Sequence, residues 1–335
     1  MPERGAGHPA PLVFRKRVPG GAMLDQSQID AFNRDGVIVV PDVLAGDVLA
    51  AVRAEYSGLL DTLYAGWHRE GRVPPPEGRD FQDKLLTSYK AGCDWFQPMD
   101  ISLPGDEITP DTPFHFGPAV FDMITCARLL DLVECLIGPE ITSNPIQHVR
   151  LKPPAGELHK DEIRAHVGGT DWHQDRGVAH EEADATTMVT VWLAISDATV
   201  ENGCLQAIPG TPRMYPHCPK TQTAIADGVL DVGKAQALPV KAGGAVIFHP
   251  LTPHASLDNV SKQFRWSFDI RYNVTGQPTG RAHFPDFVAR SRAQPETELR
   301  DWRAWLSMWE HARARLSGQA HIPIHRWDAS SPSCA

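Results

Sequence analysis

The sequence predicts a mainly β domain, a sandwich or barrel, flanked by α-helices. Short β-rich runs alternate with turn signals between residues 141 and 272, and this spacing is typical of such folds. Helical periodicity is present before this segment and again after it, and no internal repeat is evident. The length of 335 residues suits one large domain with elaborations or two small ones, and a composition of 42% hydrophobic and 22% charged residues is typical of a globular protein.

Two helices and a strand are expected in the N-terminal part. Asp25 is a suitable N-cap for a first helix, which Gly36 ends. The apolar run at 37–40 follows as a strand, and a second helical pattern extends from about 45 to 63. Residues 65–118 are rich in proline, glycine and aromatic residues without a clear period, so the sequence assigns them no element.

The β-rich segment follows a third helix at 129–136, which Gly138 and Pro139 end. Strands are expected at 146–151, 187–195, 204–208, 245–248 and 264–272. In the last of these strands apolar and polar residues alternate, so one face is apolar and the other polar. That polar face is either exposed to solvent or lines a polar cavity inside a barrel.

The two ends of the chain differ from this core. Residues 1–22 predict a disordered leader, because basic residues stand among glycine and proline without the apolar run of a secretory signal. We expect a single domain over 23–290, followed at 291–335 by a helix and a tail that pack on it. The helix is expected between Pro295 and Gly318. Its apolar stripe, which favours core packing over a subunit interface, consists of Leu299, Trp302, Trp305, Leu306 and Trp309.

Composition disfavours several classes of function. A net charge of -9 disfavours nucleic acid as a partner, since that partner calls for a basic surface. The apolar runs fall well short of the roughly 20 residues that a membrane-spanning helix needs. Six cysteines without a C-x-x-C pair indicate neither a thiolate zinc site nor a redox dithiol, and predict reduced thiols in a cytoplasmic protein. The expected partner is a small-molecule substrate, and the oligomeric state is left open.

The candidate metal ligands are His173, Asp175 and His254. His173 and Asp175 stand two residues apart, so on an extended backbone both side chains point the same way. His254 follows the strand at 245–248 and supplies a second histidine. Two histidines and one carboxylate on one face of iron(II) leave open positions for a co-substrate and O2. A second His-x-Asp pair at 159–161 lies in a charged stretch without a strand to fix its geometry, which disfavours it.

Arg265, on the polar face of the last strand, is the candidate anion-binding residue. A guanidinium binds a carboxylate through two parallel, charge-assisted hydrogen bonds, which suits the distal carboxylate of 2-oxoglutarate. Ser256, two residues after His254, is placed to add a hydroxyl. The alternative for Arg265 taken alone is a surface ion pair. Asp269 and Arg271 share its face of the strand, where they contact a substrate or pair with each other.

A family resemblance is carried by seven segments in order: QIDAFNRDGVIVVPDVL, VECLIGPEI with RLKPP, WHQD, VWLAI, ENGCLQAIPGTPR, GGAVIFHPLTPHAS and FRWSF. Over about residues 23–290 the chain resembles the phytanoyl-CoA dioxygenase family of iron(II)- and 2-oxoglutarate-dependent oxygenases. The resemblance implies a double-stranded β-helix, the cupin-like jelly roll. It also implies iron(II) on the three candidate ligands, 2-oxoglutarate on Arg265 and Ser256, and O2 as the oxidant.

The resemblance assigns further roles and a range of reactions. Trp192 matches a position that packs near the co-substrate, and Gln174 one that faces the pocket. The implied reaction is oxidation of an unactivated C–H bond by hydroxylation, ring closure or desaturation. Halogenation is disfavoured, because Asp175 fills the place that related halogenases give to a small residue. The long charged segment 155–172 predicts a polar lid beside the iron, and hence a polar substrate. The resemblance also implies a substrate from specialised metabolism, such as antibiotic biosynthesis, which the wider family serves.

Three rival functions are considered. One is an acyl-CoA hydroxylase, which keeps the chemistry and changes the substrate. The second is a catalytically silent jelly-roll binding protein, because a fold does not fix a function. The third is a zinc hydrolase with the same three ligands, against which Arg265 and the order of the segments speak.

Overall fold

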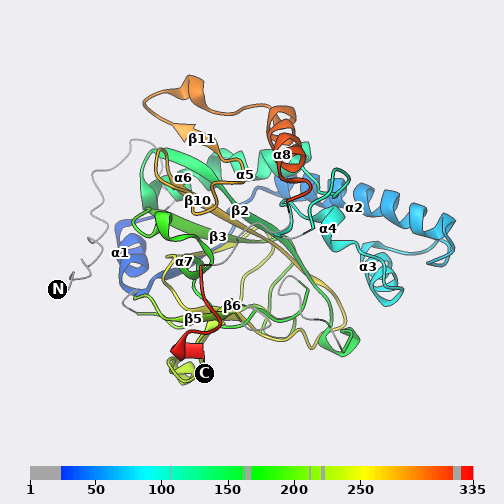
Figure 1. The fold of residues 1–335 in the computed structure, drawn as a ribbon, viewed down its shortest axis with the longest axis horizontal. Coiled ribbons are helices and arrows are strands. Elements are labelled where there is room, and N and C mark those ends of the chain that lie inside the picture. Colours follow the sequence, from blue (N-terminus) through cyan, green and yellow to red (C-terminus); the bar gives the residue numbers. More distant parts are fainter. Residues whose placement is uncertain are drawn as a thin grey trace.

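Two antiparallel β-sheets form the centre of the molecule (Figure 1). The computed structural model describes residues 24–105, 107–160, 162, 167–210, 213–219, 223–319 and 326–334, so the expected leader at 1–22 lies outside the described residues. The larger sheet has the strand order β1-β8-β3-β10-β2-β11, with β1 (Val37–Val40), β2 (Glu140–Lys152), β3 (Met188–Ala194), β8 (Ala245–Phe248), β10 (Arg265–Val274) and β11 (Phe287–Ser291). The smaller sheet has the order β7-β4-β9, with β4 (Leu205–Ala207), β7 (Gln236–Leu238) and β9 (His254–Ser256). A ribbon of β5 (His217–Pro219) and β6 (Thr223–Ile225) stands apart from both.

The larger sheet has two different faces. On β3, Val191 and Leu193 belong to the main hydrophobic cluster with the helices, whereas Trp192 and Ala194 belong to a second cluster with the smaller sheet. Because successive side chains of a strand point to opposite faces, the larger sheet lies between the helices and the smaller sheet. This arrangement confirms the jelly roll that the resemblance implies.

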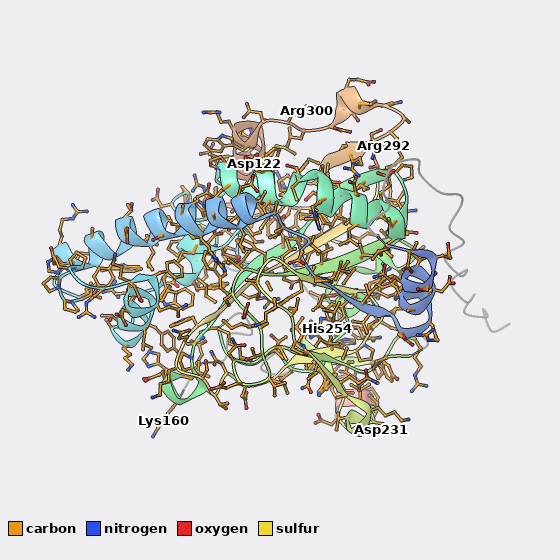
Figure 2. All side chains as sticks on the ribbon, turned by 180° about the vertical axis from the view of Figure 1, so that it is seen from behind. Asp122, Lys160, Asp231, His254, Arg292 and Arg300 are labelled. Atoms are coloured by element: carbon orange, nitrogen blue, oxygen red, sulfur yellow. A yellow bond between two sulfur atoms is a disulfide. The ribbon has the colours of Figure 1, made fainter. Side chains whose placement is uncertain are left out.

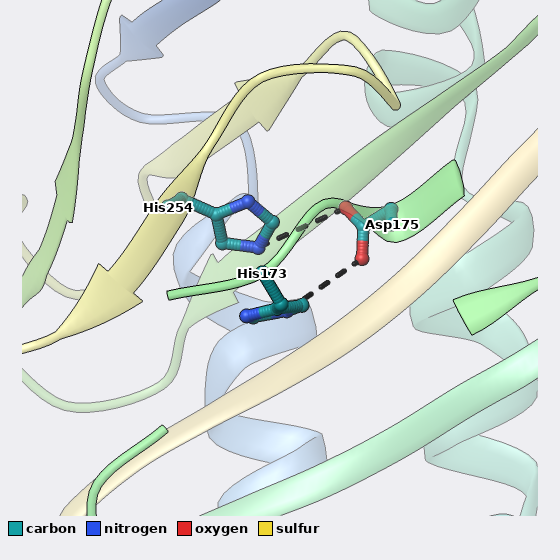
Figure 3. Close-up of side chains that lie close together, drawn as sticks. All are labelled: His173, Asp175 and His254. Carbon is teal, nitrogen blue, oxygen red and sulfur yellow. Dashed lines mark ion pairs between the residues drawn. The ribbon is translucent and has the colours of Figure 1, made fainter. Parts of the chain in front are cut away.

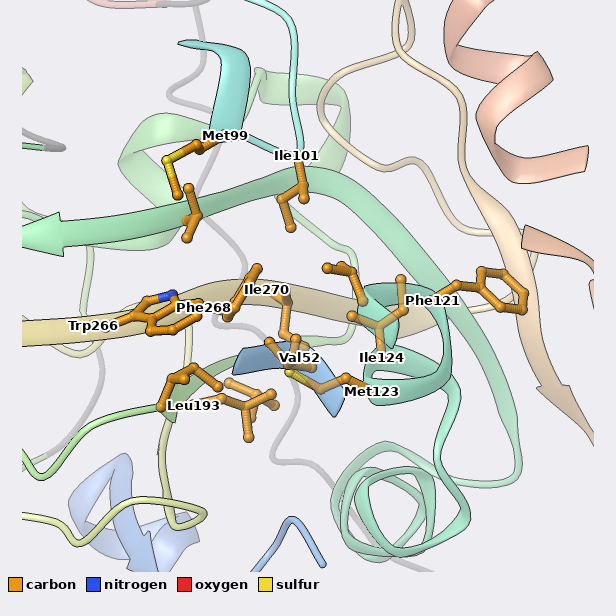
Figure 4. Packing of buried hydrophobic residues seen from close by; sticks show 14 of the residues in the cluster. Val52, Met99, Ile101, Phe121, Met123, Ile124, Leu193, Trp266, Phe268 and Ile270 are labelled. Atoms are coloured by element: carbon orange, nitrogen blue, oxygen red, sulfur yellow. The ribbon is translucent and has the colours of Figure 1, made fainter. Parts of the chain in front are cut away.

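Apolar and polar side chains also alternate along strand β10, and their burial shows where the polar face lies. Trp266, Phe268 and Ile270 pack in the main cluster beneath the helices (Figure 4). Each polar side chain that alternates with them is at most 7% exposed: Arg265, Ser267, Asp269 and Arg271. The polar face therefore lies inside the protein, and the solvent-exposed alternative is wrong.

Helices cover the outer face of the larger sheet. The α-helices are α1 (Gln26–Asp35), α2 (Gly46–Arg69), α3 (Phe81–Lys90), α4 (Phe96–Met99), α5 (Pro118–Thr125), α6 (Ala127–Ile137), α7 (Asp175–Val178) and α8 (Trp302–Leu316). Short 3-10 turns occur at Ala155–Glu157, Glu181–Ala183, Val232–Lys234, Pro295–Thr297 and Pro332–Cys334. The expected start and end of α1 are confirmed, since Asp25 caps it and Gly36, at φ 73°, ends it. Within the described residues, no helix has both the length and the apolar content that a membrane span requires.

The region 65–118, which gave no periodicity, contains the end of α2 together with α3 and α4. Much of it is fixed to β2 through the buried carboxylate of Asp100. One oxygen of Asp100 accepts the backbone N–H of Val149 at 2.9 Å, and the other lies 2.8 Å from Nδ1 of His148. These contacts join residues far apart in the sequence, so a local pattern does not reveal them.

A disulfide between Cys218 and Cys334 joins β5 to the C-terminal residues. The prediction that all cysteines are reduced is therefore wrong for this pair. The two residues are 116 positions apart, and no local motif brings them together. The other four cysteines are free: Cys93, Cys126, Cys135 and Cys204.

Helix α8 contributes four residues to the buried interior. The buried residues are Trp305, Trp309, Ala312 and Leu316. Trp302, which was expected to belong to the stripe, is only half-buried. The helix begins at Trp302 rather than near Pro295, because the 3-10 turn at Pro295–Thr297 precedes it.

Replacement of Trp305 by alanine is expected to lower the free energy of unfolding by about 3 to 5 kcal/mol, because a fully buried indole leaves a cavity. Trp305 is 1% exposed and packs edge-on against Phe116. Trp302→Ala on the same helix is the matched control and is expected to cost about 1 kcal/mol. Urea denaturation measures both, and equal losses would contradict the assignment of Trp305 to the core.

Candidate metal centre

Backbone hydrogen bonds bring the two candidate histidine ligands together. His173 and His254 form an isolated antiparallel bridge, in which each N–H donates to the other residue's carbonyl oxygen at 3.0 Å. Their ring centroids are 4.2 Å apart. His254 begins β9, so the bridge adds His173 to the edge of the smaller sheet. Main-chain contacts thus make neighbours of two residues 81 positions apart in the sequence.

Asp175 completes the cluster by a change of backbone conformation. Gln174 is extended, with φ -122° and ψ 138°, and Asp175 is the first residue of the helical turn α7. The expected extended backbone therefore holds only as far as Gln174. Asp175 Oδ1 lies 4.0 Å from His173 Nε2, and its Oδ2 lies 3.8 Å from His254 Nε2 (Figure 3). One ligand atom from each residue lies within 4.8 Å of the others.

The protonation of these three side chains suits a metal ion. His173 Nδ1 lies 2.8 Å from the carbonyl oxygen of Asp171, and His254 Nδ1 lies 3.0 Å from that of Thr252. Each Nδ1–H therefore donates to a carbonyl, which leaves the Nε2 lone pair for a metal. Burial, with the nearby His254 second, lowers the pKa of His173 to about 3, so its ring is neutral. Oδ2 of Asp175 is buried without a hydrogen-bond partner, as expected of a metal ligand.

Other side chains hold the turn that carries Asp175. The amide of Gln174 donates to the carbonyl oxygens of Arg213 and Leu251 and accepts from the N–H of Tyr215, at 2.6 to 2.8 Å. All of its hydrogen bonds go to backbone, so the expectation that Gln174 faces the pocket is wrong. It is a structural residue between two candidate ligands.

His217 and Trp327 also hold this turn, and sequence reasoning missed both. His217 Nε2 accepts the backbone N–H of Gln174 at 3.0 Å, and Trp327 stacks on the ring of His217 with centroids 5.1 Å apart. The indole N–H of Trp327 donates to the carbonyl oxygen of Gly177 at 2.7 Å. A Cβ at Gly177 would lie 2.5 Å from His217 Nε2, so a larger residue here would displace the His217 ring. No local pattern links the C-terminal residues to the turn.

A cavity opens beside His173 and His254. It is lined by Arg150, Thr170, His173, Thr190, Trp192, Leu205, Phe248, His254, Ala255, Arg265 and Asp269. The expected lid at 155–172 borders this cavity through Thr170, whereas Asp161 and residues 163–166 lie outside the described residues. The cavity lies between the two sheets, where the polar face of β10 is buried.

Arg265 lies in this cavity with unused hydrogen-bond donors. It is 4% exposed, and its Nε and Nη1 are buried without hydrogen-bond partners. Its guanidinium carbon lies 4.9 Å from the ring centroid of Trp192, so the expected Trp192 position is part of the same wall. Buried donors without partners are costly, and an anion in this cavity would satisfy them. A surface ion pair, the alternative for Arg265, is wrong.

Lys152 is a second cation at this place, and its role was not predicted. It is the β2 residue directly paired with Arg265 of β10, and its Nζ donates to Ser256 Oγ at 2.9 Å. Burial, followed by the charge of Arg265, lowers the pKa of Lys152 to about 7. Ser256 is therefore linked to the expected anion site by its hydrogen bond with Lys152, the neighbour of Arg265. The signal was the strand pairing, which the sequence alone does not give.

Asp269 and Arg271 have different environments. Asp269 lines the cavity and accepts from Arg150 Nη2 at 2.8 Å. Arg271 lies 4.0 Å from Asp269 but donates at closer range to Asp175 Oδ1. Arg271 thus contacts a candidate metal ligand and does not line the cavity.

The alternative pair at 159–161 does not join the centre. The backbone N–H of His159 donates to the hydroxyl of Tyr89 at 3.0 Å, and its Nε2 lies 2.9 Å from the carbonyl oxygen of Tyr89. Asp161 lies outside the described residues. Lys160, next to His159, is at the periphery of the molecule and well apart from His254 (Figure 2).

The fold and the site together define a jelly-roll protein with a candidate centre of two histidines and one carboxylate. The sequence model described as phytanoyl-CoA dioxygenase (PhyH) matches residues 32–267, so the chain belongs to that family. It is 26% identical over 218 residues to the peroxisomal phytanoyl-CoA dioxygenase of Bos taurus, covering 60% of this chain and 60% of that protein. It is 32% identical over 268 residues to a phytanoyl-CoA dioxygenase domain-containing protein 1 homolog of Caenorhabditis elegans, covering 72% and 88%.

Solved structures give the same fold. The non-heme monooxygenase ThoJ superposes with a TM-score of 0.56 at 19% sequence identity, covering 86% of this chain and 95% of that chain. At this identity the likeness supports the fold alone. The alignment with the bovine enzyme spans less than two thirds of that protein.

Replacement of His173, Asp175 or His254 by alanine is expected to weaken Mn(II) binding by on the order of 100-fold or more, because two remaining ligands hold a divalent metal poorly. His159→Ala is the control and should bind Mn(II) like the unaltered protein. Calorimetric titration measures affinity, and circular dichroism checks that each variant is folded. Loss of binding in His159→Ala with normal binding in His173→Ala would refute the assignment.

Proposed function

We propose that the protein is an iron(II)- and 2-oxoglutarate-dependent dioxygenase that oxidises an unactivated C–H bond of a small polar molecule. One observation carries the proposal: His173 and His254, which cluster with the buried Asp175, line the same cavity as the partnerless guanidinium of Arg265. Two histidines and one carboxylate suit iron(II) with open positions. A buried guanidinium with free donors suits the far carboxylate of a dicarboxylic acid.

Each residue has a distinct task in this proposal. His173, Asp175 and His254 hold the iron on one face, and iron(II) with 2-oxoglutarate and O2 supplies the oxidising chemistry. Arg265 binds the distal carboxylate through two hydrogen bonds, while the face of Trp192 limits where that carboxylate lies. Family membership and the match of the whole site to this co-substrate favour this function over a zinc hydrolase or a silent binding protein.

The cavity wall favours a polar substrate. Once 2-oxoglutarate occupies the Arg265 side, the charged groups left in the lining are Arg150 and Asp269, an ion pair at 2.8 Å. A substrate with hydrogen-bonding groups, such as a glycoside or an amino-acid-derived metabolite of specialised metabolism, matches this wall. An apolar acyl chain would bury that pair without compensation, which disfavours the acyl-CoA hydroxylase. The same chemistry can give hydroxylation, ring closure or desaturation, and the orientation of the substrate in the cavity determines which of them occurs.

The decisive experiment measures O2 consumption and succinate formation by the iron(II)-loaded protein with 2-oxoglutarate. We expect slow succinate formation without substrate, stimulated by members of a panel of amino acids and glycosides and not by palmitoyl-CoA. Absence of any iron-dependent conversion of 2-oxoglutarate would favour the silent binding protein. Stimulation by palmitoyl-CoA alone would establish the acyl-CoA hydroxylase instead.

Arg265→Ala is expected to raise the concentration of 2-oxoglutarate required for half-maximal turnover by about 10- to 100-fold, the equivalent of about 1.5 to 3 kcal/mol for a lost charge-assisted hydrogen bond. Arg265→Lys should restore only part of the affinity, because an ammonium lacks the planar pair of donors. Arg313→Ala on helix α8 is the control. An unchanged 2-oxoglutarate requirement in Arg265→Ala would remove this residue from the site.

Binding of 2-oxoglutarate at pH 8 is expected to be accompanied by proton uptake at Lys152. With a pKa of about 7 the amine is mostly neutral at pH 8, and a carboxylate bound beside it raises that pKa. The uptake should fade as the pH falls below 7, where the amine already carries its proton. Calorimetry in buffers of different ionisation enthalpy measures the uptake. Its persistence in Lys152→Met would assign the proton to another group.

A further inference from the structure

Arg271 has a contact that the proposed chemistry does not use. It lies on the polar face of β10, 3% exposed, and its Nη2 donates to Oδ1 of Asp175. Its Nη1 donates to the carbonyl oxygen of Ile146 at 3.0 Å. The guanidinium is thereby fixed at two points, one of them a candidate metal ligand.

An irregularity in β2 provides the second of these points. Between Asp269 and Arg271, β10 advances two residues, whereas the paired residues of β2 advance four, from His148 to Asn144. Pro145 lies in this stretch and has no N–H to offer a ladder. The Asn144 side chain stabilises it by accepting the N–H of Ile146 at 2.9 Å and donating to Asn273 and Thr279. Within this bulge the Ile146 carbonyl accepts from Arg271.

The two oxygens of Asp175 are consequently not equivalent. Oδ1 lies 4.0 Å from His173 Nε2 and is held by Arg271, whereas Oδ2 lies 3.8 Å from His254 Nε2 and is buried without a hydrogen-bond partner. A carboxylate binds a metal through one oxygen or through both. Binding through both would occupy a position that the co-substrate or O2 needs.

We propose that Arg271 is a positioning residue that restricts Asp175 to one metal-binding oxygen and so preserves an open coordination position. This inference rests on the proposed function, because it assumes a metal on His173, Asp175 and His254. The alternative role, pairing with Asp269, is secondary, since that contact is 4.0 Å. Removal of Arg271 should free Oδ1 to turn toward the metal.

The test counts the water molecules on Mn(II) bound to the protein without 2-oxoglutarate, by water-proton relaxation. In Arg271→Met we expect the inner-sphere relaxation enhancement to fall by about one third, the loss of one of three open positions that a facial set of three ligands leaves. The Mn(II) affinity should be equal or tighter, because a cation beside the site has been removed. Arg271→Lys should fall between, since one ammonium cannot serve both Asp175 and Ile146.

Arg290→Met is the matched control. Arg290 is also buried and ion-paired, at 2.8 Å from Glu134 of α6, so this variant should lose stability without changing the relaxation or the affinity.

Each outcome has a distinct meaning. Unchanged relaxation in Arg271→Met and Arg271→Lys, with Mn(II) still bound, would overturn the inference and leave the proposed function intact. Loss of Mn(II) binding in folded variants of Arg271 would show a structural need for this residue and would also overturn it. Failure of the unaltered protein to bind Mn(II) would contradict the metal centre itself. If Arg271→Met does not fold, the partial fall expected for Arg271→Lys decides the question.

Discussion

The site depends above all on the two backbone hydrogen bonds between His173 and His254. Because they join main-chain atoms, they fix the two residues side by side and so bring both imidazoles together. The carbonyl oxygens of Asp171 and Thr252 then orient the rings, and the turn after Gln174 delivers the third ligand. Metal binding thus needs little reorganisation of the backbone, which lowers its entropic cost.

Among the described charged residues at the cavity, Arg265 is the one without an oppositely charged partner. Arg150, Asp269, Arg271 and Asp175 alternate in sign along a buried row, so each charge has an opposite neighbour, as buried charges require. Arg265 has no carboxylate partner among the described residues, and burial, followed by the charge of Arg150, lowers its pKa to about 9. Arg265 is therefore suited to bind an anion, whereas the charges of Arg150, Asp269, Arg271 and Asp175 are already paired.

The sequence singles out the three candidate ligands because suitable residue types occur there in or beside predicted strands. His173, Asp175 and His254 combine the right residue types with strand-like context, and Arg265 stands on an alternating strand. Lys152 and Arg150 were missed, because their roles come from the register of β2 and β10, which is set by tertiary packing. Arg271 was singled out, but its contact with Asp175 was not foreseen. The same holds for region 65–118, which Asp100 and similar long-range contacts organise, and for the helical turn after Gln174, which no periodicity signals.

The contact of Trp327 with His217 has a consequence for the order in which the protein is made. Asp175 precedes Trp327 by 152 positions, which at about 5 to 20 residues per second corresponds to roughly 8 to 30 seconds of synthesis. Until residues 326–334 are made, the turn at Gln174 lacks both the indole that packs on His217 and the link from Cys334 to Cys218. A nascent chain therefore contains the three candidate ligands before it contains the residues that support their turn.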